Sequence, residues 1–358
     1  MPPLTPAPSG DHTDPRHWRA VIDAPTAPAI GIEEELMVLD AETLDLAPRA
    51  AELADTFGAD DDRIRTELPA AQLELVTRPA ATVDAALDEL AALRHAAAEL
   101  GASRGLRLAG AGAHPFAATT GQLTQRPRYE RIAAEYGPVA RRQLVFGLHV
   151  HVSVRGADRA LAVYNALREH LPFIAAIATN APLYDGADTG LASVRPLLSA
   201  LLPRHGIPPA FASWDELAAA HAWGRVSDRI PDAGSWWWEA RLHPQWGTLE
   251  VRVPDTQATL AETGAVVRRV HALVDELATR HDAGDLPPPA PTWRIAENRW
   301  SACRYGLDAE LADPRTGART PVRELIDIDR TGADRLREVA REHGVHGATA
   351  WLAERFTA

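Results

Sequence analysis

The sequence predicts an α+β fold in which helices cover one face of a mainly antiparallel sheet. Segments with the two-residue period of strands are interspersed with Ala- and Leu-rich segments of helical character. No Gly-x-Gly-x-x-Gly motif follows a strand to open a helix, which argues against a dinucleotide-binding parallel sheet. The 358 residues contain no run of about 18 apolar residues, so no membrane span is predicted.

The chain divides into a short tail and one large domain. Residues 1–28 are rich in proline and lack periodicity, so we expect a loosely packed N-terminal tail. Residues 29–358 are expected to form a single domain. Its patterns predict, in order, strands at 31–40 and at the end of 67–77, a helix at 82–100, a short strand from 106, a helix at 128–142, a strand at 143–154, a helix at 157–171, two strands around a turn at 245–247, a helix from a Thr259–Glu262 capping box to about 280, and a mostly helical C-terminal segment.

The charge pattern limits the possible partners and mechanisms. The net charge of −12 argues against nucleic acid and anionic membranes as partners. All 37 basic residues are arginine, which excludes a Walker A loop, a protein-kinase active site and a pyridoxal phosphate Schiff base, because each needs a lysine. If the protein handles phosphate, arginines and metal ions must therefore do so.

The cellular compartment follows from the N-terminus and the cysteine content. The N-terminus has no apolar signal segment, and one cysteine cannot form an internal disulfide, so a cytoplasmic protein is expected. Cys303 lies in an ACRYG segment with no histidine partner near it in the sequence. We expect it to be a small packed side chain and not a nucleophile.

The strand at 31–40 carries three consecutive glutamates. Because strand side chains alternate between faces, Glu33 and Glu35 share one face, and Glu34 takes the other with Leu36. Two carboxylates on one face repel each other unless a cation lies between them. Taken alone, the pattern favours an exposed edge strand with solvated glutamates.

Three further predicted strands also place polar side chains on a single face. They carry Glu74 beside Gln72, His149 and His151 in HVH, and Glu250 and Arg252 in LEVRV. Each pattern alone also fits an ordinary structural role, as a solvent-facing strand, a hydrogen-bonded polar face or a cross-strand ion pair. Together, and with Glu67, they form an oxygen-rich set with histidine that suits Mg²⁺ or Mn²⁺ better than structural Zn²⁺. More than four carboxylates suggest several ions, as where metals bridge nucleotide phosphates.

Six segments occur in the order GIEEELMVLD, QLELVT, FGLHVHVSV, DGADTGLASVRP, RLHPQWGTLEVRVPD and ENRWSACRYGLDAEL. In this order and spacing they resemble the carboxylate–amine ligases of the glutamate–cysteine ligase type 2 group. The resemblance implies a fold like the catalytic domain of glutamine synthetase, with a curved antiparallel sheet forming a funnel and helices on its outer face. It also implies ATP, Mg²⁺ or Mn²⁺, and small-molecule carboxylate and amine substrates, with L-glutamate and L-cysteine as the default pair. A homodimer is expected.

The resemblance also implies roles for individual residues. By matching positions, Arg195 and Arg252 resemble the arginines that meet phosphate or the substrate carboxylate, and Arg299 and Arg304 are further candidates for binding the nucleotide. The implied metal ligands are Glu33, Glu35, Glu67, Glu74, His149 and Glu250. No firm role is implied for His114 and Tyr129, and the run Trp236–Trp238 fits either an unusual pocket or the core.

The implied reaction activates a carboxylate as an acyl phosphate, which an amine then attacks to give an amide. Two other interpretations stay open. A metal-dependent amide hydrolase would use His149 and His151 with carboxylates to activate water. A catalytically inactive relative would bind nucleotide or amino acid without releasing phosphate.

Overall fold

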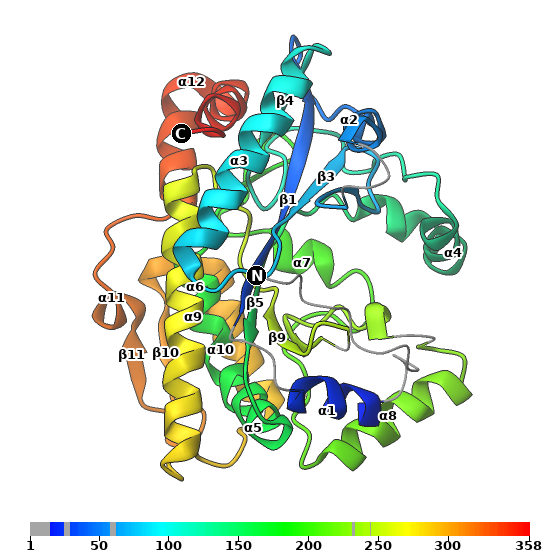
Figure 1. Cartoon of the computed structure of the whole chain (residues 1–358). Coiled ribbons are helices and arrows are strands. Elements are labelled where there is room, and N and C mark those ends of the chain that lie inside the picture. Colours follow the sequence, from blue (N-terminus) through cyan, green and yellow to red (C-terminus); the bar gives the residue numbers. More distant parts are fainter. Residues whose placement is uncertain (1–14, 25–28, 58–61, 231–232, 244) are drawn as a thin grey trace.

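The computed structural model describes residues 15–24, 29–57, 62–230, 233–243 and 245–358. Its centre is a seven-stranded sheet in the order β2-β3-β1-β5-β9-β8, with β4 pairing with the C-terminal end of β1 (Figure 1). The paired strands run antiparallel. They are β1 (Ile30–Asp40), β2 (Ile64–Thr66), β3 (Gln72–Val76), β4 (Leu106–Ala109), β5 (Leu148–Ser153), β8 (Ala240–Leu242) and β9 (Thr248–Val251).

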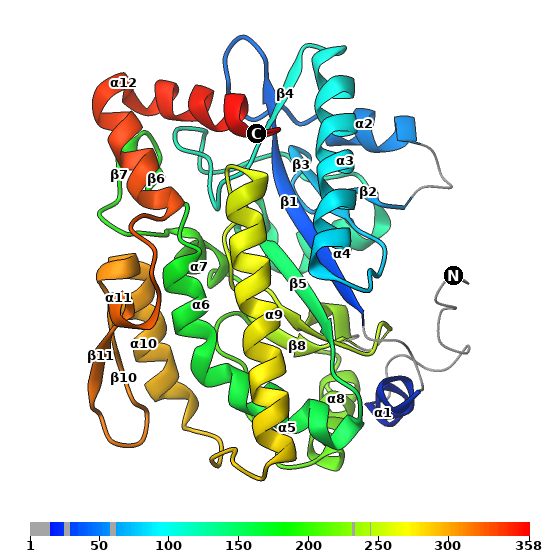
Figure 2. The same ribbon diagram turned by 60° about the vertical axis from the view of Figure 1, so that its left-hand side comes forward.

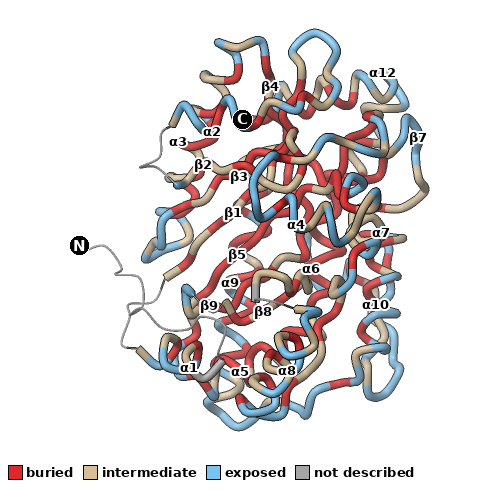
Figure 3. The backbone as a smooth tube through the Cα atoms, turned by 90° about the vertical axis from the view of Figure 1, so that its right-hand side faces the viewer, coloured by how far each residue is buried: buried red, intermediate tan, exposed pale blue. Residues whose placement is uncertain are grey.

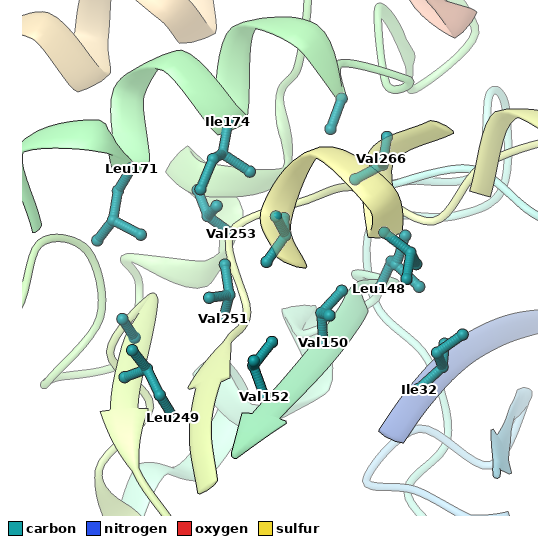
Figure 4. Packing of buried hydrophobic residues seen from close by; sticks show 14 of the residues in the cluster. Ile32, Leu148, Val150, Val152, Leu171, Ile174, Leu249, Val251, Val253 and Val266 are labelled. Carbon is teal, nitrogen blue, oxygen red and sulfur yellow. The ribbon is translucent and has the colours of Figure 1, made fainter. Parts of the chain in front are cut away.

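Helices cover one face of this sheet, as Figure 2 shows for α3 (Val83–Ala102), α5 (Ala157–Leu167), α6 (Leu171–Ile177) and α9 (Leu260–Asp282). The apolar side chains of alternate strand positions point toward these helices. In Figure 4, Val150 and Val251 of the sheet lie in one cluster with Ile174 of α6 and Val266 of α9. The predicted α+β class, with an antiparallel sheet and helices on one face, is therefore confirmed.

The core face of β1 also carries a charged pair that the sequence patterns do not predict. Glu34 and Arg94 are buried between β1 and α3, and two hydrogen bonds of 2.7 and 2.6 Å join the guanidinium to the carboxylate. Thr263 of α9 donates to Glu34 at 3.0 Å, and Arg94 donates to the carbonyl of Phe356 at 2.8 Å. The pair therefore ties β1, α3, α9 and the C-terminal segment together.

The remaining elements surround the sheet. α9 begins with the predicted capping box of Thr259 and Glu262, and α12 bends at Gly344, where φ is 71°. The other helices and short hairpins are α1 (Pro15–Asp23), α2 (Ala50–Phe57), α4 (Pro127–Tyr136), η1 (Gly137–Arg142), η2 (Arg168–His170), β6 (Leu183–Tyr184), β7 (Ala187–Asp188), α7 (Arg195–Ser199), α8 (Trp214–Val226), η3 (Ala233–Ser235), α10 (Thr292–Tyr305), η4 (Gly306–Asp308), β10 (Glu310–Ala312), β11 (Arg319–Pro321), α11 (Val322–Leu325) and α12 (Gly332–Arg355).

The N-terminal segment differs from the expectation. Residues 1–14 and 25–28 of the expected tail lie outside the described residues. Residues 15–23 form α1, in which Trp18 is buried and meets the ring of His221 in α8 edge-on at 4.4 Å. The expectation of a loose tail is wrong for this segment, because Trp18 and Ile22 are four residues apart and share one apolar helix face.

One further finding concerns membranes. Among the residues that the structure describes, no helix is long and apolar enough to cross a bilayer.

Candidate active-site cleft

A cleft with a volume of about 410 Å³ lies on the face of the sheet that α3 and α9 leave open. Side chains from β1, β2, β3, β5 and β8 form its floor together with Arg252, which directly follows β9, and α4 and α7 stand at its sides. Glu250 of β9 is fully buried beneath this floor and does not line the cleft. Figure 3 shows the molecule from this direction, with buried strands behind α4 and α7. The polar members of the alternating strand patterns therefore meet in one place, because their apolar neighbours point into the core.

Strand register places the acidic side chains against one another. Glu35 of β1 lies directly opposite Glu74 of β3, and Glu33 lies opposite His149 of β5. Glu34 points to the opposite face, as the sequence predicts. This pairing crowds the carboxylates at the centre of the cleft.

Within the described part of the chain, two groups of side chains have the spacing of metal ligands. Glu33, His149 and Glu250 each offer an atom within 4.8 Å of the others, and Glu35, Glu74 and His149 form a second such group. His149 belongs to both groups. Glu67 lines the cleft but joins neither group, although its charge acts on Glu35 and Glu74.

Burial holds three of the glutamates closer to neutrality than in water. It raises the pKa of Glu35 to about 7, while Arg195 pulls in the other direction and Glu67 adds to the rise. Burial also raises the pKa of Glu74 well above its usual value, and the charge of Glu33 raises it further. The pKa of Glu67 is raised by burial as well, against the opposing effect of Arg128. A cation among these carboxylates would offset the burial and relieve the repulsion that together raise their pKa values.

Two other glutamates are held ionised. Burial alone would raise the pKa of Glu33, but the neighbouring His151 and His149 outweigh it and hold the pKa well below its usual value. In the same way, Arg241 and Arg252 outweigh burial at Glu250. Both arginines donate directly to the Glu250 carboxylate.

His149 is neutral and has one free ring nitrogen. Burial, together with the charge of Arg252, lowers its pKa to about 4. Its Nδ1 lies 3.2 Å from Glu33, whereas the buried Nε2 makes no hydrogen bond to any described residue and lies 3.8 Å from Glu35. A neutral imidazole nitrogen among carboxylates is a suitable ligand for a divalent cation. These side chains therefore fit Mg²⁺ or Mn²⁺.

The two predicted arginines also reach the cleft. Arg252 contacts Glu250 and lies 3.4 Å from Nδ1 of His149. Arg195, at the start of α7, donates to the carbonyls of Val253 and Arg252 at 3.1 and 3.2 Å. Its guanidinium lies over Gly147, where a Cβ atom would come within 2.1 Å of Nη2. A side chain at position 147 would therefore displace the Arg195 guanidinium from this position.

Arg299 and Arg304 do not line the cleft. Arg299 is almost buried and donates through Nε to both oxygens of Glu239, at 2.8 and 2.9 Å, so it acts on the cleft through that residue. Arg304 lies beside Gly190 and over the ring of Tyr305. The two arginines are five residues apart on α10, which turns their side chains about 140° away from each other.

Several cleft residues were not among the candidates. They include Arg241, opposite Glu250 in the β8–β9 hairpin, and also Arg65, Arg128, His205 and His243. The predicted turn at 245–247 was a signal for Arg241, since the hairpin register pairs it with Glu250. His151 hydrogen bonds to Thr248 at 2.9 Å, and although burial lowers its pKa, the charge of Glu33 raises it above the usual value.

The residues without an implied role divide between cleft and core. Trp237 and Tyr129 line the cleft, and Tyr129 donates to the carbonyl of Thr66 at 3.0 Å. Trp236 is buried and stacks on His221 at 3.8 Å, with Trp238 edge-on against it at 4.4 Å. The tryptophan run therefore supplies both a cleft wall and core packing. His114 is buried outside the cleft, where its Nδ1 accepts from the backbone of Phe116 and Ala117.

The structure is thus of the α+β class, with a cleft in which carboxylates, one neutral imidazole and arginines lie close together. Among solved structures, a glutamate–cysteine ligase from Francisella tularensis in complex with AMP matches with a TM-score of 0.69 at 13% identity, over 92% of this chain and 88% of that one. A bifunctional glutathione synthetase from Pasteurella multocida matches with a TM-score of 0.63 at 14% identity, over 96% of this chain and 53% of that one. The fold is therefore that of the glutamine-synthetase-like ligases.

The chain belongs to glutamate–cysteine ligase family 2, whose model matches residues 29–355. A candidate glutamate–cysteine ligase 2 of Corynebacterium glutamicum strain R is 38% identical over 287 residues, which cover 79% of this chain and 76% of that protein. A candidate glutamate–cysteine ligase 2-3 of Rubrobacter xylanophilus is 37% identical over 356 residues, covering 91% of this chain and 96% of that protein. The protein is accordingly a ligase, and the resemblance inferred from the six segments is confirmed.

Proposed function

We propose that this protein is an ATP-dependent carboxylate–amine ligase that forms an amide through an acyl phosphate. The main support is the crowding of Glu35, Glu74 and Glu33 around His149 beside two arginines, because such a site suits metal ions bound to a triphosphate. The names of the relatives make L-glutamate and L-cysteine, or a related amino acid or amine, the default substrates. The AMP complex of the Francisella tularensis enzyme supports ATP as the nucleotide.

The proposed reaction has two steps. An oxygen of the substrate carboxylate attacks the γ-phosphorus of ATP, and the bond from phosphorus to the β-phosphate oxygen breaks, so that ADP leaves. The amine nitrogen then attacks the acyl carbon, the bond from carbon to the phosphate oxygen breaks, and inorganic phosphate leaves with the amine losing a proton. The protein contributes mainly position and charge to both steps.

The cleft residues and the buried Glu250 divide this work. Glu33, Glu35, Glu67, Glu74, His149 and Glu250 would hold the metal ions. Bound there, Mg²⁺ or Mn²⁺ would neutralise charge on the triphosphate. Arg195 and Arg252 would hold the transferred phosphoryl group and the substrate carboxylate. Arg299 would contribute by fixing Glu239, whereas Arg304, which does not line the cleft, is left out of the proposed nucleotide site.

The wider organisation also belongs to the proposal. We infer that residues 29–358 act as one catalytic domain, against which α1 packs. The homodimer and the cytoplasmic location stay predictions. Light scattering of the purified chain tests the first, and fractionation of the source cells tests the second.

The test is phosphate release from Mg-ATP with a panel of carboxylates, each paired with several amines. Glu74→Ala should lower turnover more than about a hundredfold, because the ligand group of Glu35, Glu74 and His149 loses one of its two carboxylates. Glu250→Ala should act in the same way. Glu42→Ala, at an exposed position just past β1, is the matched control and should leave turnover unchanged.

Three results would count against the proposal. Normal turnover in Glu74→Ala or Glu250→Ala would refute the metal assignment. Absence of phosphate release with every pair would refute the ligase reaction for these substrates. Hydrolysis of an amide without ATP would favour the metal-dependent hydrolase instead.

A further inference from the structure

The guanidinium of Arg195 has a single charged partner in the part of the chain that the structure describes. Its other contacts are the carbonyls of Val253 and Arg252, and its buried Nε makes no hydrogen bond to any described residue. The charged partner is Asp255, whose Oδ1 lies 3.8 Å from Nη1 of Arg195. Burial lowers the pKa of Arg195, and Asp255 opposes this effect more than any other charge.

Asp255 is itself held by the backbone beneath the cleft. It is 3% exposed and does not line the cleft, so it lies away from any ligand bound there. Its Oδ2 accepts a hydrogen bond from the backbone nitrogen of Asn180 at 2.7 Å. On another side, a Cβ atom added to Gly112 would come within 2.6 Å of the carboxyl carbon. A buried carboxylate is costly without partners, and Arg195 is the cation that faces it.

The position of Asp255 in the sheet matches that of Gly147. The two residues lie directly opposite each other where the antiparallel pairing continues beyond β5 and β9. The guanidinium of Arg195 occupies the space where Gly147 lacks a side chain. Gly147 therefore provides the space for Arg195, and Asp255 provides the opposite charge beside it.

We propose that Asp255 is a positioning residue, which fixes the guanidinium of Arg195 for the reaction without touching the ligand. The inference rests on the proposed ligase function, in which Arg195 helps to hold the phosphoryl group and the substrate carboxylate. A displacement of about 1 Å in such a group can cost about a hundredfold in rate. Asp255→Asn is the test variant, because it keeps an oxygen acceptor for Asn180 and removes the charge that faces Arg195.

The experiment measures phosphate release from Mg-ATP in Asp255→Asn, Arg195→Gln and the double variant. Asp282→Asn is the matched control, because it removes the partner of Arg159 at the end of α9, where the two side chains lie 2.6 Å apart. A second measurement does not need turnover. In protein with ¹⁵N-labelled arginine, the Nε–H resonance of Arg195, assigned by its loss in Arg195→Gln, reports the surroundings of the guanidinium.

Asp255→Asn should lower kcat/KM at least about tenfold, through the same constant, kcat or KM, that changes in Arg195→Gln. The double variant should be no slower than Arg195→Gln alone, because Asp255 acts through Arg195. The Nε–H resonance should shift in Asp255→Asn and stay in place in Asp282→Asn. Additive losses in the double variant would overturn the proposal, as would an unshifted resonance. Full turnover in Arg195→Gln would also overturn it, since Asp255 would have no functional side chain to position.

Two outcomes need a separate arm. If Asp255→Asn does not fold, as judged by circular dichroism, Gly112→Ala takes its place, because the added Cβ displaces the Asp255 carboxylate. It should reproduce the loss of turnover and the shifted resonance, and unchanged values would overturn the proposal. If no substrate pair releases phosphate, the ligase function fails, and the resonance still decides whether Asp255 fixes Arg195.

Discussion

The buried pair of Glu34 and Arg94 gives a sharp test of how β1 is held. Arg94 makes five hydrogen bonds, two to Glu34 and one each to Thr263 and the carbonyls of Gln257 and Phe356. Arg94→Met keeps much of the apolar volume but removes all five. It leaves the Glu34 carboxylate buried with the Thr263 hydroxyl as its remaining donor among the described residues.

The expected cost follows from this uncompensated charge. Breaking a buried ion pair from one side typically costs about 3–5 kcal/mol, because the remaining charge stays out of water. Replacing both members, as in Glu34→Met with Arg94→Met, removes that charge and should be less destabilising than Arg94→Met alone. The exposed pair of Arg268 and Asp84, at 2.7 Å, joins the neighbouring helices, and Arg268→Met should cost less than about 1 kcal/mol.

Equilibrium urea unfolding, followed by circular dichroism, measures all three variants against the unchanged protein. The reasoning is refuted if Arg94→Met loses less stability than the Arg268→Met control. It is also refuted if the double variant is less stable than Arg94→Met, since that outcome would show that the pair contributes more than two hydrophobic side chains in its place.

Three further predictions concern turnover and metal binding. Gly147→Ala should lower ATP turnover about a hundredfold by displacing Arg195. Gly31→Ala is the control and should not lower turnover, because the nearest atom to its added Cβ lies at 3.6 Å. Equal turnover in the two variants would contradict the close approach of Arg195 to Gly147. Burial raises the pKa of Glu35 to about 7, so a proton competes with the metal ion below that pH. Mn²⁺ binding measured by calorimetry should therefore strengthen from pH 6 to 7 and release protons; a flat profile would contradict this. Cys303→Ser should keep turnover within about twofold, because burial raises the pKa of the thiol to about 11 and so disfavours the nucleophilic thiolate. A large loss of turnover in a steady-state assay would contradict the expectation that Cys303 is not a nucleophile.

The sequence was most informative where one rule of local geometry decides the outcome. Alternation along β1 places Glu33 and Glu35 in the cleft and Glu34 in the core, as expected. The capping box at Thr259 and Glu262 begins α9 as predicted. In both cases the determining residues lie within a few positions of one another, so the pattern is complete without knowledge of the fold.

The misses share a different origin. Arg94 occupies an Ala- and Leu-rich helix, and its partner Glu34 is 60 residues away, so no local pattern connects them. Arg304 was a candidate because of its position in the segment ENRWSACRYG. Its side chain points away from the cleft, whereas Arg299 on the same helix contacts the cleft residue Glu239. Trp237 and Trp236 are adjacent in sequence and nevertheless serve cleft and core. The residues that such a side chain contacts depend on how segments distant in the sequence pack together.

The two-sided charge of β1 has a consequence for how this chain can change during evolution. Deleting or inserting one residue before Glu33 would exchange the two faces of the strand, burying Glu33 and Glu35 among apolar helices and turning Glu34 away from Arg94. Such a change would damage the core and the cleft at once, whereas point substitutions affect one side at a time. Length variation in related chains should therefore be absent from β1 and concentrated in loops, such as the turn between β8 and β9.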